Sequence, residues 1–593
     1  MADSATSKLS SRMARLNPFK SKSMSRREED DEDIGQEIDA DTLAGGGHSA
    51  FQTDITLRRL RVSEALKCFL SHEGVLNEDD AEGLGALLDK PIVSPPAHLI
   101  DRSHPLPEYY ISSSHNTYLM AHQLYGTSSA AAYETTLRAG ARCIEIDAWD
   151  NPDDPKEPKV THGYTLVSNI PFRAVCETVR DVVDLEATSP PVQGYSPAPI
   201  LVSLENHCDH SGQLRLVQIM KQVWGDRLLS APVREKGHEE QEGGEPVRLE
   251  ELGSKIAVIV EYHLPDEADD SSDSSDSSSS SDSEEEEKQA RKKYKTKKKA
   301  APPPIIVPEL AELGVYAQSV KPRDTSWFTD GKIKDGPPRH HLVNMSESRV
   351  ASHMTEHAVE IAQHNARHLM RVFPKGTRIS SHNLSPITFW AIGAQICALN
   401  WQVFGASMQL NDALFAGTPG YVLKPAALRP GGSGNPSSQA PRKMLQLRVA
   451  GATDIPLPEG RDVDEIKPYL TCTLLQPGSG PDPIKVKRKT APYHRRRIAP
   501  LPFLGLGRGE RGNPENTDPV WDETLEWEFV DDELVFVRML IKSDDSFSSN
   551  PILAVSAVRL VYVEPGWRFV RMLDLRGHET QCSLLVKFEV RDV

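Results

Sequence analysis

The feature that most constrains the fold is an alternation of short apolar runs with longer amphipathic stretches. The apolar runs lie at 109–113, 143–148, 200–204 and 255–260, and the amphipathic stretches at 129–139, 172–186 and 212–224. Strands that are apolar along their whole length are typical of parallel sheets covered by helices. The alternation therefore predicts an α/β fold made of parallel βα units.

Two further patterns follow these alternating runs along the chain, and a third pattern precedes them. Between residues 308 and 430 regular structure resumes, with an amphipathic helix predicted at 355–371 and a short helix near 386–389. From residue 443 to 593 apolar and polar residues alternate between turn signals, as in an all-β sandwich. In front of the α/β region, residues 51–99 show two helical periods, which predict a short helical segment resembling the remnant of an EF-hand.

Three segments lack the apolar residues that a folded core needs. Residues 1–50 are rich in serine and charge, and residues 431–442 form a Gly/Ser/Pro spacer. Within 264–307, eleven carboxylates at 266–287 precede eight Lys or Arg side chains at 288–299. In residues 1–50 and 264–307 such composition predicts disorder, because too little apolar surface is available to offset the entropy of ordering the chain. Serines beside acidic residues in this linker are candidate targets of a kinase. The two parts of the α/β region are then 100–263 and 308–430.

The overall composition argues against several classes of protein. With a net charge of −17, nucleic acid is not expected as a partner. The seven cysteines are scattered and lack a CxxC pair, which argues against a disulfide framework and a cysteine zinc site. We expect no signal segment, because the first 50 residues lack an apolar run, and the most apolar run, at 389–399, is too short to span a bilayer. We expect a cytoplasmic protein whose contact with membranes is peripheral.

Oxygen-bearing side chains stand at the ends of the apolar runs, where an α/β barrel keeps its chemistry. Residues two apart in a strand share a face, so Glu145 and Asp147 project together. Glu205 ends a further run, and Asn116 adds a carboxamide after the first. All four are hard oxygen ligands, and this set suits Ca²⁺.

Two histidines accompany these oxygen ligands. His115 and His162 suit acid–base work on a phosphodiester, one at the phosphorus and one at the leaving oxygen. Paired carboxylates in a barrel could instead serve a glycosidase, but two separate histidines and few aromatic residues to stack a sugar favour phosphoester cleavage. An inactive lipid-binding scaffold is the remaining alternative, against which the intact histidines and ligands argue.

The segments that carry these residues resemble the X half of phosphoinositide-specific phospholipase C. They read Ile-Ser-Ser-Ser-His-Asn-Thr-Tyr at 111–118, Cys-Ile-Glu-Ile-Asp-Ala-Trp-Asp at 143–150, His-Gly-Tyr-Thr at 162–165 and Ser-Leu-Glu-Asn-His at 203–207. The second half is similar to the Y region at 344–347, 368–374, 383–386, 398–401 and 420–425, and Asp518-Pro-Val-Trp521 resembles the family's C2 domain. The resemblance implies a split (β/α)8 TIM-like barrel followed by an all-β C2-like sandwich at 443–593, in a delta-like architecture lacking a pleckstrin-homology domain.

The resemblance also implies roles for individual residues. The ligands of a Ca²⁺ ion would be Asn116, Glu145, Asp147 and Glu205. His115 would steady the pentacoordinate phosphorus, His162 would protonate the diacylglycerol oxygen, and Glu145 would take the proton of the inositol 2-hydroxyl. The products would be diacylglycerol and a cyclic phosphate that water then opens, in lipid signalling.

The residues expected to read the head group match the family only in part. Ser346 and Arg371 match contacts to inositol and its 4-phosphate, and Phe373 stands where the family has a stacking tyrosine. Animal members carry two phosphate-binding lysines in the strand after Lys255, where a gap-free match places Ile259 and Glu261. We therefore expect weaker discrimination among phosphatidylinositol, its 4-phosphate and its 4,5-bisphosphate. The alternative is that another cation reaches the site, the candidates being Lys321, Arg323 and Arg339.

The remaining expectations concern membranes and regulation. The C2-like region has Lys467 at its first-loop position and an incomplete set of tip aspartates, so we expect a scaffold packed on the barrel with weak or no Ca²⁺ binding. The basic run at 485–497 is a candidate for contact with an anionic membrane, the alternative being a solvated loop. The acidic linker is expected to cover the active-site mouth until the protein docks. The sequence indicates neither an oligomeric state nor an activator.

Overall fold

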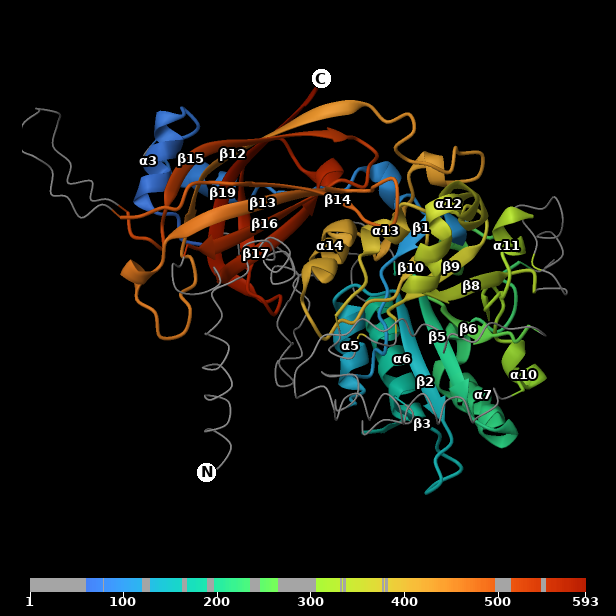
Figure 1. Ribbon diagram of the computed structural model, residues 1–593. Coiled ribbons are helices and arrows are strands. Elements are labelled where there is room, and N and C mark those ends of the chain that lie inside the picture. Colours follow the sequence, from blue (N-terminus) through green and yellow to red (C-terminus); the bar gives the residue numbers. More distant parts are fainter. Residues whose placement is uncertain are drawn as a thin grey trace, which may run out of the picture.

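The computed structural model describes residues 60–77, 79–119, 128–162, 168–188, 197–234, 246–264, 305–330, 333, 338–375, 378, 382–495, 514–544 and 551–593. These residues form an α/β barrel and an all-β sandwich that lie against each other (Figure 1). Residues 1–59 and 265–304, which hold the N-terminal tail and nearly all of the linker, lie outside the described residues, and the disorder expected of them stays a prediction.

Eight parallel strands of the described chain close the barrel. They are β1 (Tyr109–Ile111), β2 (Cys143–Trp149), β5 (Ile200–His207), β6 (Ile256–Glu261), β7 (Gln318–Val320), β8 (His341–Ser346), β9 (Leu369–Phe373) and β10 (Ile396–Cys397). Each pairs in parallel with the next, and β10 pairs with β1. A parallel bridge between Ser113 and Cys143 joins β1 to β2. The predicted split barrel is confirmed.

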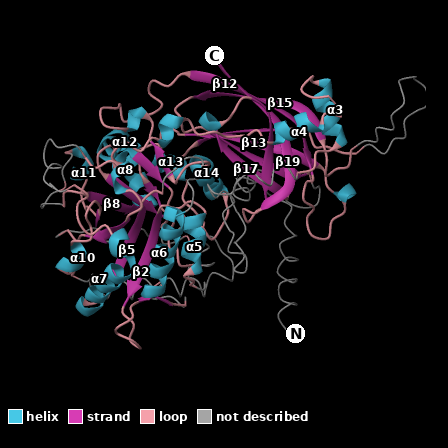
Figure 2. Cartoon of the chain, turned by 180° about the vertical axis from the view of Figure 1, so that it is seen from behind, coloured by secondary structure: helices cyan, strands magenta, loops and turns pink. Residues whose placement is uncertain are grey.

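Shorter strands extend the barrel sheet on both sides. Antiparallel β11 (Tyr421–Leu423) pairs with β1, and the hairpin of β3 (Lys159–Val160) and β4 (Ile170–Pro171) pairs with β2. Helices surround the strands (Figure 2). They are α5 (Ala131–Arg138), α6 (Phe172–Thr188), α7 (His210–Trp224), α8 (Leu249–Leu252), α10 (Pro308–Ala311), α11 (Ser326–Thr329), α12 (Glu347–Asn365), α13 (Pro386–Trp390) and α14 (Ala406–Phe415).

The alternation of side chains along the strands creates an inner and an outer core. Ile144 and Ile146 of β2 face outward and pack with Val175 and Val179, which recur at helical spacing on α6. On the inner face, residues such as Leu201 belong to a separate apolar cluster that fills the barrel. The barrel is thus a packed body whose polar groups gather at its ends.

One predicted element is wrong. The helix expected at 355–371 is α12, which ends at Asn365, and Leu369 already begins β9. Leu369, Met370 and Val372 are all buried in that strand, and a short run of buried residues cannot be told from a helix by periodicity alone. The correction moves Arg371 from a helix onto β9, where its side chain is only 4% exposed.

The C-terminal region is one antiparallel sheet folded into two layers. Its strands are β12 (Arg442–Thr453), β13 (Pro468–Gln476), β14 (Ile484–Lys489), β15 (Val520–Val530), β16 (Phe536–Ser543), β17 (Ile552–Arg559), β18 (Gly566–Leu573) and β19 (Glu579–Asp592). The layers β14-β13-β16-β17 and β18-β19-β12-β15 share a single residue pair, Val555 with Leu573. Leu470 of one layer and Trp527 of the other lie in the same core. This confirms the predicted all-β sandwich.

The sandwich packs on the barrel and carries the N-terminal helices. Arg538 Nε of β16 donates to Gln409 Oε1 of α14 at 2.6 Å, and Tyr562 Oη donates to the Leu414 carbonyl at 2.9 Å. The predicted helical segment forms α3 (Glu64–His72) and α4 (Ala81–Leu88), and Leu66 and Trp567 belong to the apolar cluster that joins it to the sandwich. Among the described helices, none is both long and apolar enough to cross a bilayer.

Candidate active site

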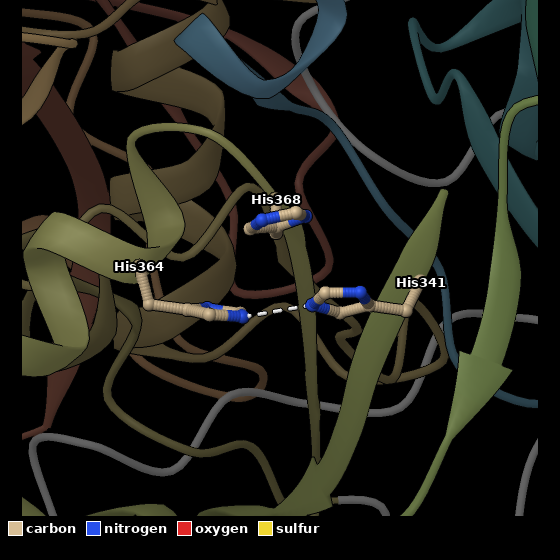
Figure 3. A group of neighbouring side chains, drawn as sticks. All are labelled: His341, His364 and His368. Atoms are coloured by element: carbon tan, nitrogen blue, oxygen red, sulfur yellow. Dashed lines mark hydrogen bonds between the residues drawn. The ribbon is translucent and has the colours of Figure 1, made fainter. Parts of the chain in front are cut away.

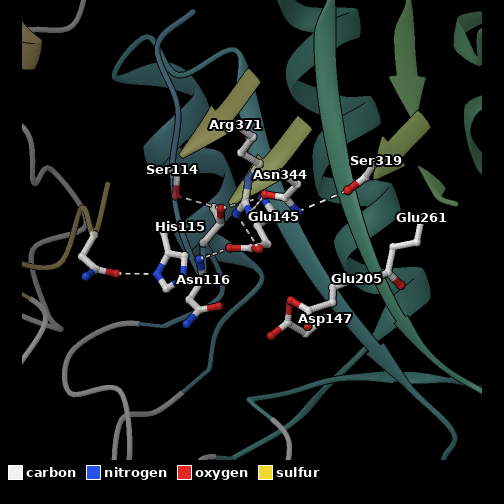
Figure 4. Close-up of polar contacts among 12 residues, drawn as sticks. Ser114, His115, Asn116, Glu145, Asp147, Glu205, Glu261, Ser319, Asn344 and Arg371 are labelled. Atoms are coloured by element: carbon white, nitrogen blue, oxygen red, sulfur yellow. Dashed lines mark hydrogen bonds and ion pairs between the residues drawn. The ribbon is translucent and has the colours of Figure 1, made fainter. Parts of the chain in front are cut away.

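Three carboxylates meet at the C-terminal end of the barrel strands. Glu145 and Asp147 extend from β2 and Glu205 from β5, and one oxygen of each lies within 4.8 Å of the others (Figure 4). β2 and β5 pair in parallel with Asp147 opposite Glu205. Because side chains alternate along each strand, this register turns all three carboxylates to the same face. The structure therefore brings together the three acidic residues that the sequence singled out.

Of the three carboxylates, Asp147 has the surroundings that a bound cation would stabilise most. Burial, followed by repulsion from Glu205 and Glu145, raises its pKa well above the ordinary value of an aspartate. Tyr118 Oη donates to Asp147 Oδ2 at 2.6 Å, whereas Oδ1 is buried without a hydrogen-bond partner among the described residues. An unpartnered buried carboxylate oxygen is costly. The three carboxylates therefore fit a divalent metal ion that prefers oxygen ligands.

Arg371 supplies one positive charge to this group. Its Nη2 lies 2.6 Å from Glu145 Oε1, and Nη1 donates to Asn344 Oδ1 at 3.2 Å. Its Nε is buried and, within the described part of the chain, has no hydrogen-bond acceptor. The guanidinium carbon also lies 5.5 Å from the centre of the Phe373 ring. One guanidinium facing three carboxylates leaves the mouth of the barrel with an excess of negative charge.

The loop after β1 places a histidine and an amide beside the carboxylates. Asn116 has a φ of 46°, in the left-handed region that asparagine adopts more readily than most residues, and its backbone N–H donates to Glu145 Oε2 at 2.8 Å. His115 Nδ1 lies 2.8 Å from Asn400 Oδ1. The Asn400 Nδ2 faces the His382 carbonyl at 3.4 Å, so the amide oxygen accepts the Nδ1–H of His115. Burial lowers the pKa of His115, and Nε2 remains for a ligand.

The other predicted site residues lie on the same rim. His162 follows β3, and the neighbouring Thr161 N–H donates to the Asp147 carbonyl at 3.3 Å. Ser346 is the last residue of β8 and is buried. Phe373 is the last residue of β9, whereas Glu145 and Arg371 lie inside β2 and β9. Their individual roles stay predictions.

The two positions expected to read phosphates have different surroundings. Ile259 is 1% exposed within the apolar interior of the barrel. Glu261 lies two residues further along β6, and its Oε2 accepts the Asn206 N–H at 3.2 Å. Lys321 Nζ lies 3.9 Å from Glu261 Oε1. Of the cations named as alternatives, Lys321 therefore lies within ion-pair distance of Glu261.

Sequence reasoning missed the groups that hold the site residues in place. Asn400 orients His115, and Asn344 lies between Arg371 and Ser319, accepting from the guanidinium and donating to Ser319 Oγ at 3.2 Å. Both asparagines lie in segments that resemble the Y region. The available signal was a polar amide at the end of an apolar run, the same signal that drew attention to Asn116.

Comparison with known proteins agrees with this geometry. Residues 102–262 match the family "Phosphatidylinositol-specific phospholipase C, X domain", and residues 310–427 match its Y domain. The two halves of the barrel therefore belong to the phosphatidylinositol-specific phospholipase C family. The two matched segments hold every barrel strand described above and all nine predicted site residues.

Relatives and solved structures extend the likeness beyond the barrel. The chain is 29% identical over 508 residues to human 1-phosphatidylinositol 4,5-bisphosphate phosphodiesterase delta-1, covering 83% of this chain and 61% of the relative. It is 33% identical over 485 residues to the mouse delta-3 protein, covering 80% and 55%. The crystal structure of L. pealei PLC21 superposes with a TM-score of 0.67 at 24% identity, covering 93% of this chain and 65% of that one. The chain thus spans little more than half the length of the curated relatives.

Proposed function

We propose that this protein is a Ca²⁺-dependent enzyme that cleaves phosphoinositides into diacylglycerol and an inositol phosphate. The observation that carries the proposal is the group of Glu145, Asp147 and Glu205, the first two of them buried, beside the oriented imidazole of His115. The names of the relatives support a phosphoinositide as substrate. A glycosidase has no use for the amide-oriented histidine, and an inactive scaffold has no use for two costly buried carboxylates beside a third.

The proposed metal ion is held by oxygen atoms only. Asn116, Glu145, Asp147 and Glu205 would be its ligands, and the unpartnered Asp147 Oδ1 is the atom that most needs it. Carboxylate and amide oxygens favour Ca²⁺ over metals that prefer nitrogen or sulfur. When bound, such an ion supplies charge that lowers the pKa of the inositol 2-hydroxyl and neutralises the developing phosphate charge.

The residues of the chain then move the protons. Each oxygen of Glu145 already accepts one hydrogen bond, from Arg371 or from the Asn116 N–H, and keeps a second lone pair for the proton of the 2-hydroxyl. The freed oxygen attacks phosphorus and displaces diacylglycerol, whose oxygen takes a proton from His162. His115 offers Nε2 to the phosphoryl oxygens because Nδ1 is committed to Asn400. Attack of water on the cyclic phosphate then gives the open product.

Arg371, Ser346 and Phe373 are proposed to bind the inositol head group. The buried Nε of Arg371 is a charged donor without an acceptor among the described residues, and a phosphate oxygen is a strong acceptor for it. Phe373 lies beside the guanidinium and offers an apolar ring to one face of the sugar. These contacts require a head group that combines a ring with a phosphate.

Preference among the phosphoinositides is proposed to be weak. Glu261 adds a negative charge where animal relatives have a lysine, and Lys321 at 3.9 Å offsets that charge without adding a net positive one. Ile259 is enclosed in the barrel interior and offers no charge. The binding free energy of the 4,5-bisphosphate therefore exceeds that of phosphatidylinositol by less than it would if two lysines stood at these positions.

Membrane contact is proposed to be peripheral and electrostatic, with the protein in the cytoplasm. Within the basic run, β14 is the edge strand of the sandwich, and Lys485, Lys487, Arg488 and Lys489 are exposed along it. At the loop tip, the Asp544 N–H donates to the Lys467 carbonyl at 2.9 Å, which puts a lysine beside a candidate aspartate and supports weak or no Ca²⁺ binding there. Asp545 lies outside the described residues.

The acidic linker is proposed to restrain activity until the protein docks on an anionic surface. It begins after β6 and rejoins the barrel ahead of α10, so it is tethered to the strand that carries Glu261. Repulsion between its carboxylates and anionic lipid would withdraw it. Deleting residues 266–287 should raise the rate on vesicles, and a kinase that adds phosphate there should act oppositely to the deletion. An unchanged rate on deletion would remove the idea.

The proposed reaction can be tested by identifying its products. Phosphatidylinositol, its 4-phosphate and its 4,5-bisphosphate are supplied in matched mixed micelles with Ca²⁺, and the soluble products are followed by phosphorus NMR. We expect a cyclic inositol phosphate to precede the open phosphate, with similar rates for the three lipids. Release of phosphocholine from a control lipid, or the absence of any soluble phosphate, would contradict the proposed chemistry.

A further inference from the structure

Three histidines gather at the end of the barrel opposite the carboxylates. His341 is the first residue of β8, His364 lies near the end of α12, and His368 directly precedes β9 (Figure 3). His341 and His364 are each 7% exposed, and one nitrogen from each of the three rings lies within 4.8 Å of the others. Parallel strands begin at this end, so the group is separate from the proposed active site.

The hydrogen bonds of two rings leave two lone pairs facing each other. His364 Nδ1 lies 3.1 Å from Asn365 Oδ1, and the Asn365 Nδ2 donates to the Ile392 carbonyl at 2.9 Å, so the amide oxygen accepts the Nδ1–H. The His341 ring bonds to the backbone of Pro338, which has only a carbonyl to offer, so this ring also acts as a donor there. In the neutral form of each ring, Nε2 is then an acceptor.

The two Nε2 acceptors of His341 and His364 lie close together, and neither carries a hydrogen that it could donate to the other. The distance between His341 Nε2 and His364 Nε2 is 3.1 Å. Both rings are buried, so a second proton on either would place an uncompensated charge away from water. Two lone pairs at this distance repel each other unless a cation lies between them.

The geometry points to a metal site: we propose that His341, His364 and His368 bind a Zn²⁺ ion. Two Zn–N bonds of about 2.0–2.1 Å at a tetrahedral angle place their nitrogens about 3.3 Å apart, close to the 3.1 Å between the two Nε2 atoms. The other nitrogen of a zinc-binding imidazole usually donates to a carbonyl or carboxamide oxygen, as the rings of His341 and His364 do here. Imidazole nitrogen suits Zn²⁺ and not Ca²⁺.

His368 completes the site by a change of ring orientation. Its ring stacks on His341 with 4.0 Å between the centroids and on His364 with 4.9 Å, so its nitrogens lie in a plane nearly parallel to those rings and do not point at the gap between the two Nε2 atoms. Rotation about its side-chain bonds turns a nitrogen to the ion, and water takes the fourth position. The Trp327 ring lies edge-on to His364 at 4.8 Å and gives the site an apolar wall. A bound ion would tie the start of β8 and β9 to the end of α12.

The test measures zinc binding by the full chain without reference to catalysis. Protein stripped with a chelator is titrated with Zn²⁺, and the metal retained after gel filtration is counted, first alone and then with a large excess of Ca²⁺. We expect one zinc per chain with an affinity of about 1 μM or tighter, unchanged by Ca²⁺. Displacement of the zinc by Ca²⁺ would place it at the carboxylates and overturn the proposal.

Matched variants locate the ion. His341→Gln, His364→Gln and His368→Gln should each weaken zinc binding at least about tenfold, whereas His98→Gln, at an exposed histidine, should leave it unchanged. Circular dichroism before metal is added shows which variants fold, and the half-buried His368 is the one whose replacement perturbs the core least. Folded variants that keep wild-type zinc affinity would contradict the site.

A spectroscopic probe covers the case in which the buried variants do not fold. Co²⁺ in the unmutated protein should give the intense visible absorption of a four-coordinate site, and Zn²⁺ should abolish it. Weak absorption typical of six oxygen ligands would overturn the proposal, because it would show that the cation binds elsewhere.

Discussion

The mouth of the barrel and the edge strand β14 both concentrate charge, but in opposite surroundings. Glu145 and Asp147 are buried, and Arg371, which pairs with Glu145, is 4% exposed, whereas Lys485 and Lys487 stand in solvent. Two unit charges about 4 Å apart interact by about 4 kcal/mol at an effective dielectric of about 20 and by about 1 kcal/mol in water. Each charge in the mouth therefore interacts strongly with its neighbours. Each charge on β14 interacts weakly, so it can contribute only a small attraction to an anionic surface.

Of the changes considered, Asp147→Asn should cause the largest loss of activity, because it removes one carboxylate from the mouth of the barrel. Activity should fall by more than about 100-fold. Changing a residue that only hydrogen-bonds to a metal ligand already costs about 10–100-fold in activity or metal affinity. The metal-free protein should become more stable by roughly 1–3 kcal/mol, because one of three repelling carboxylates is removed. Hydrolysis and thermal unfolding with and without Ca²⁺ measure both effects.

The matched control for that change is Asp153→Asn, at an exposed aspartate outside the site. Ca²⁺ should raise the melting temperature of this control as it does that of the wild type. If Ca²⁺ stabilises Asp147→Asn equally well, the carboxylate group is not where the ion binds.

Asn400→Ala tests whether a buried neutral group can matter as much as the buried charges. Losing the acceptor of the His115 Nδ1–H should lower kcat by about 10–100-fold with KM nearly unchanged, because Asn400 positions the imidazole and does not touch the substrate. Asn400→Asp keeps an acceptor oxygen and should retain most of the activity. Equal losses in both variants would point to a general disturbance of the loop.

Glu261→Lys should have a larger effect on the preference among lipids than on the rate of cleavage. Replacing a partly buried carboxylate by an ammonium group should raise the preference for the 4,5-bisphosphate over phosphatidylinositol by about tenfold. Glu261→Gln should give an intermediate ratio, and both ratios come from competition in mixed micelles. A ratio that does not move would show that the phosphates lie away from β6.

Lys487→Gln on β14 should have the smallest effect. One exposed charge near an anionic surface contributes about 1 kcal/mol, so affinity for anionic vesicles should fall about fivefold and the difference should shrink in high salt. Sedimentation with vesicles measures it. Lys443→Gln, a lysine paired with Asp531 at 2.7 Å, should bind as the wild type does, and identical losses in the two variants would remove β14 as a docking strand.

The barrel and the carboxylates could be predicted because their signals are local. Apolar runs separated by helical stretches define βα units, and the spacing of Glu145 and Asp147 alone places both on one face of β2. Arg371 was misplaced for an equally local reason, because the buried residues around it extend the pattern of the preceding helix.

The supporting contacts could not be predicted because they join distant parts of the chain. His115 and Asn400 are 285 residues apart, and their contact depends on closure of the barrel between β10 and β1. The histidine cluster is similar: His341, His364 and His368 are unremarkable singly, and only the packing of α12 against the paired strands β8 and β9 brings their rings together.

The central claim is that the mouth of the barrel cleaves a phosphodiester with the help of Ca²⁺ and His115. The most direct measurement is the release of water-soluble inositol phosphate from phosphatidylinositol micelles at controlled free Ca²⁺, for the wild type and for His115→Ala. We expect release by the wild type to require Ca²⁺ and to fall by about 10²–10⁴-fold in the variant. Release that persists in a Ca²⁺ chelator, or a variant as fast as the wild type, would contradict the account.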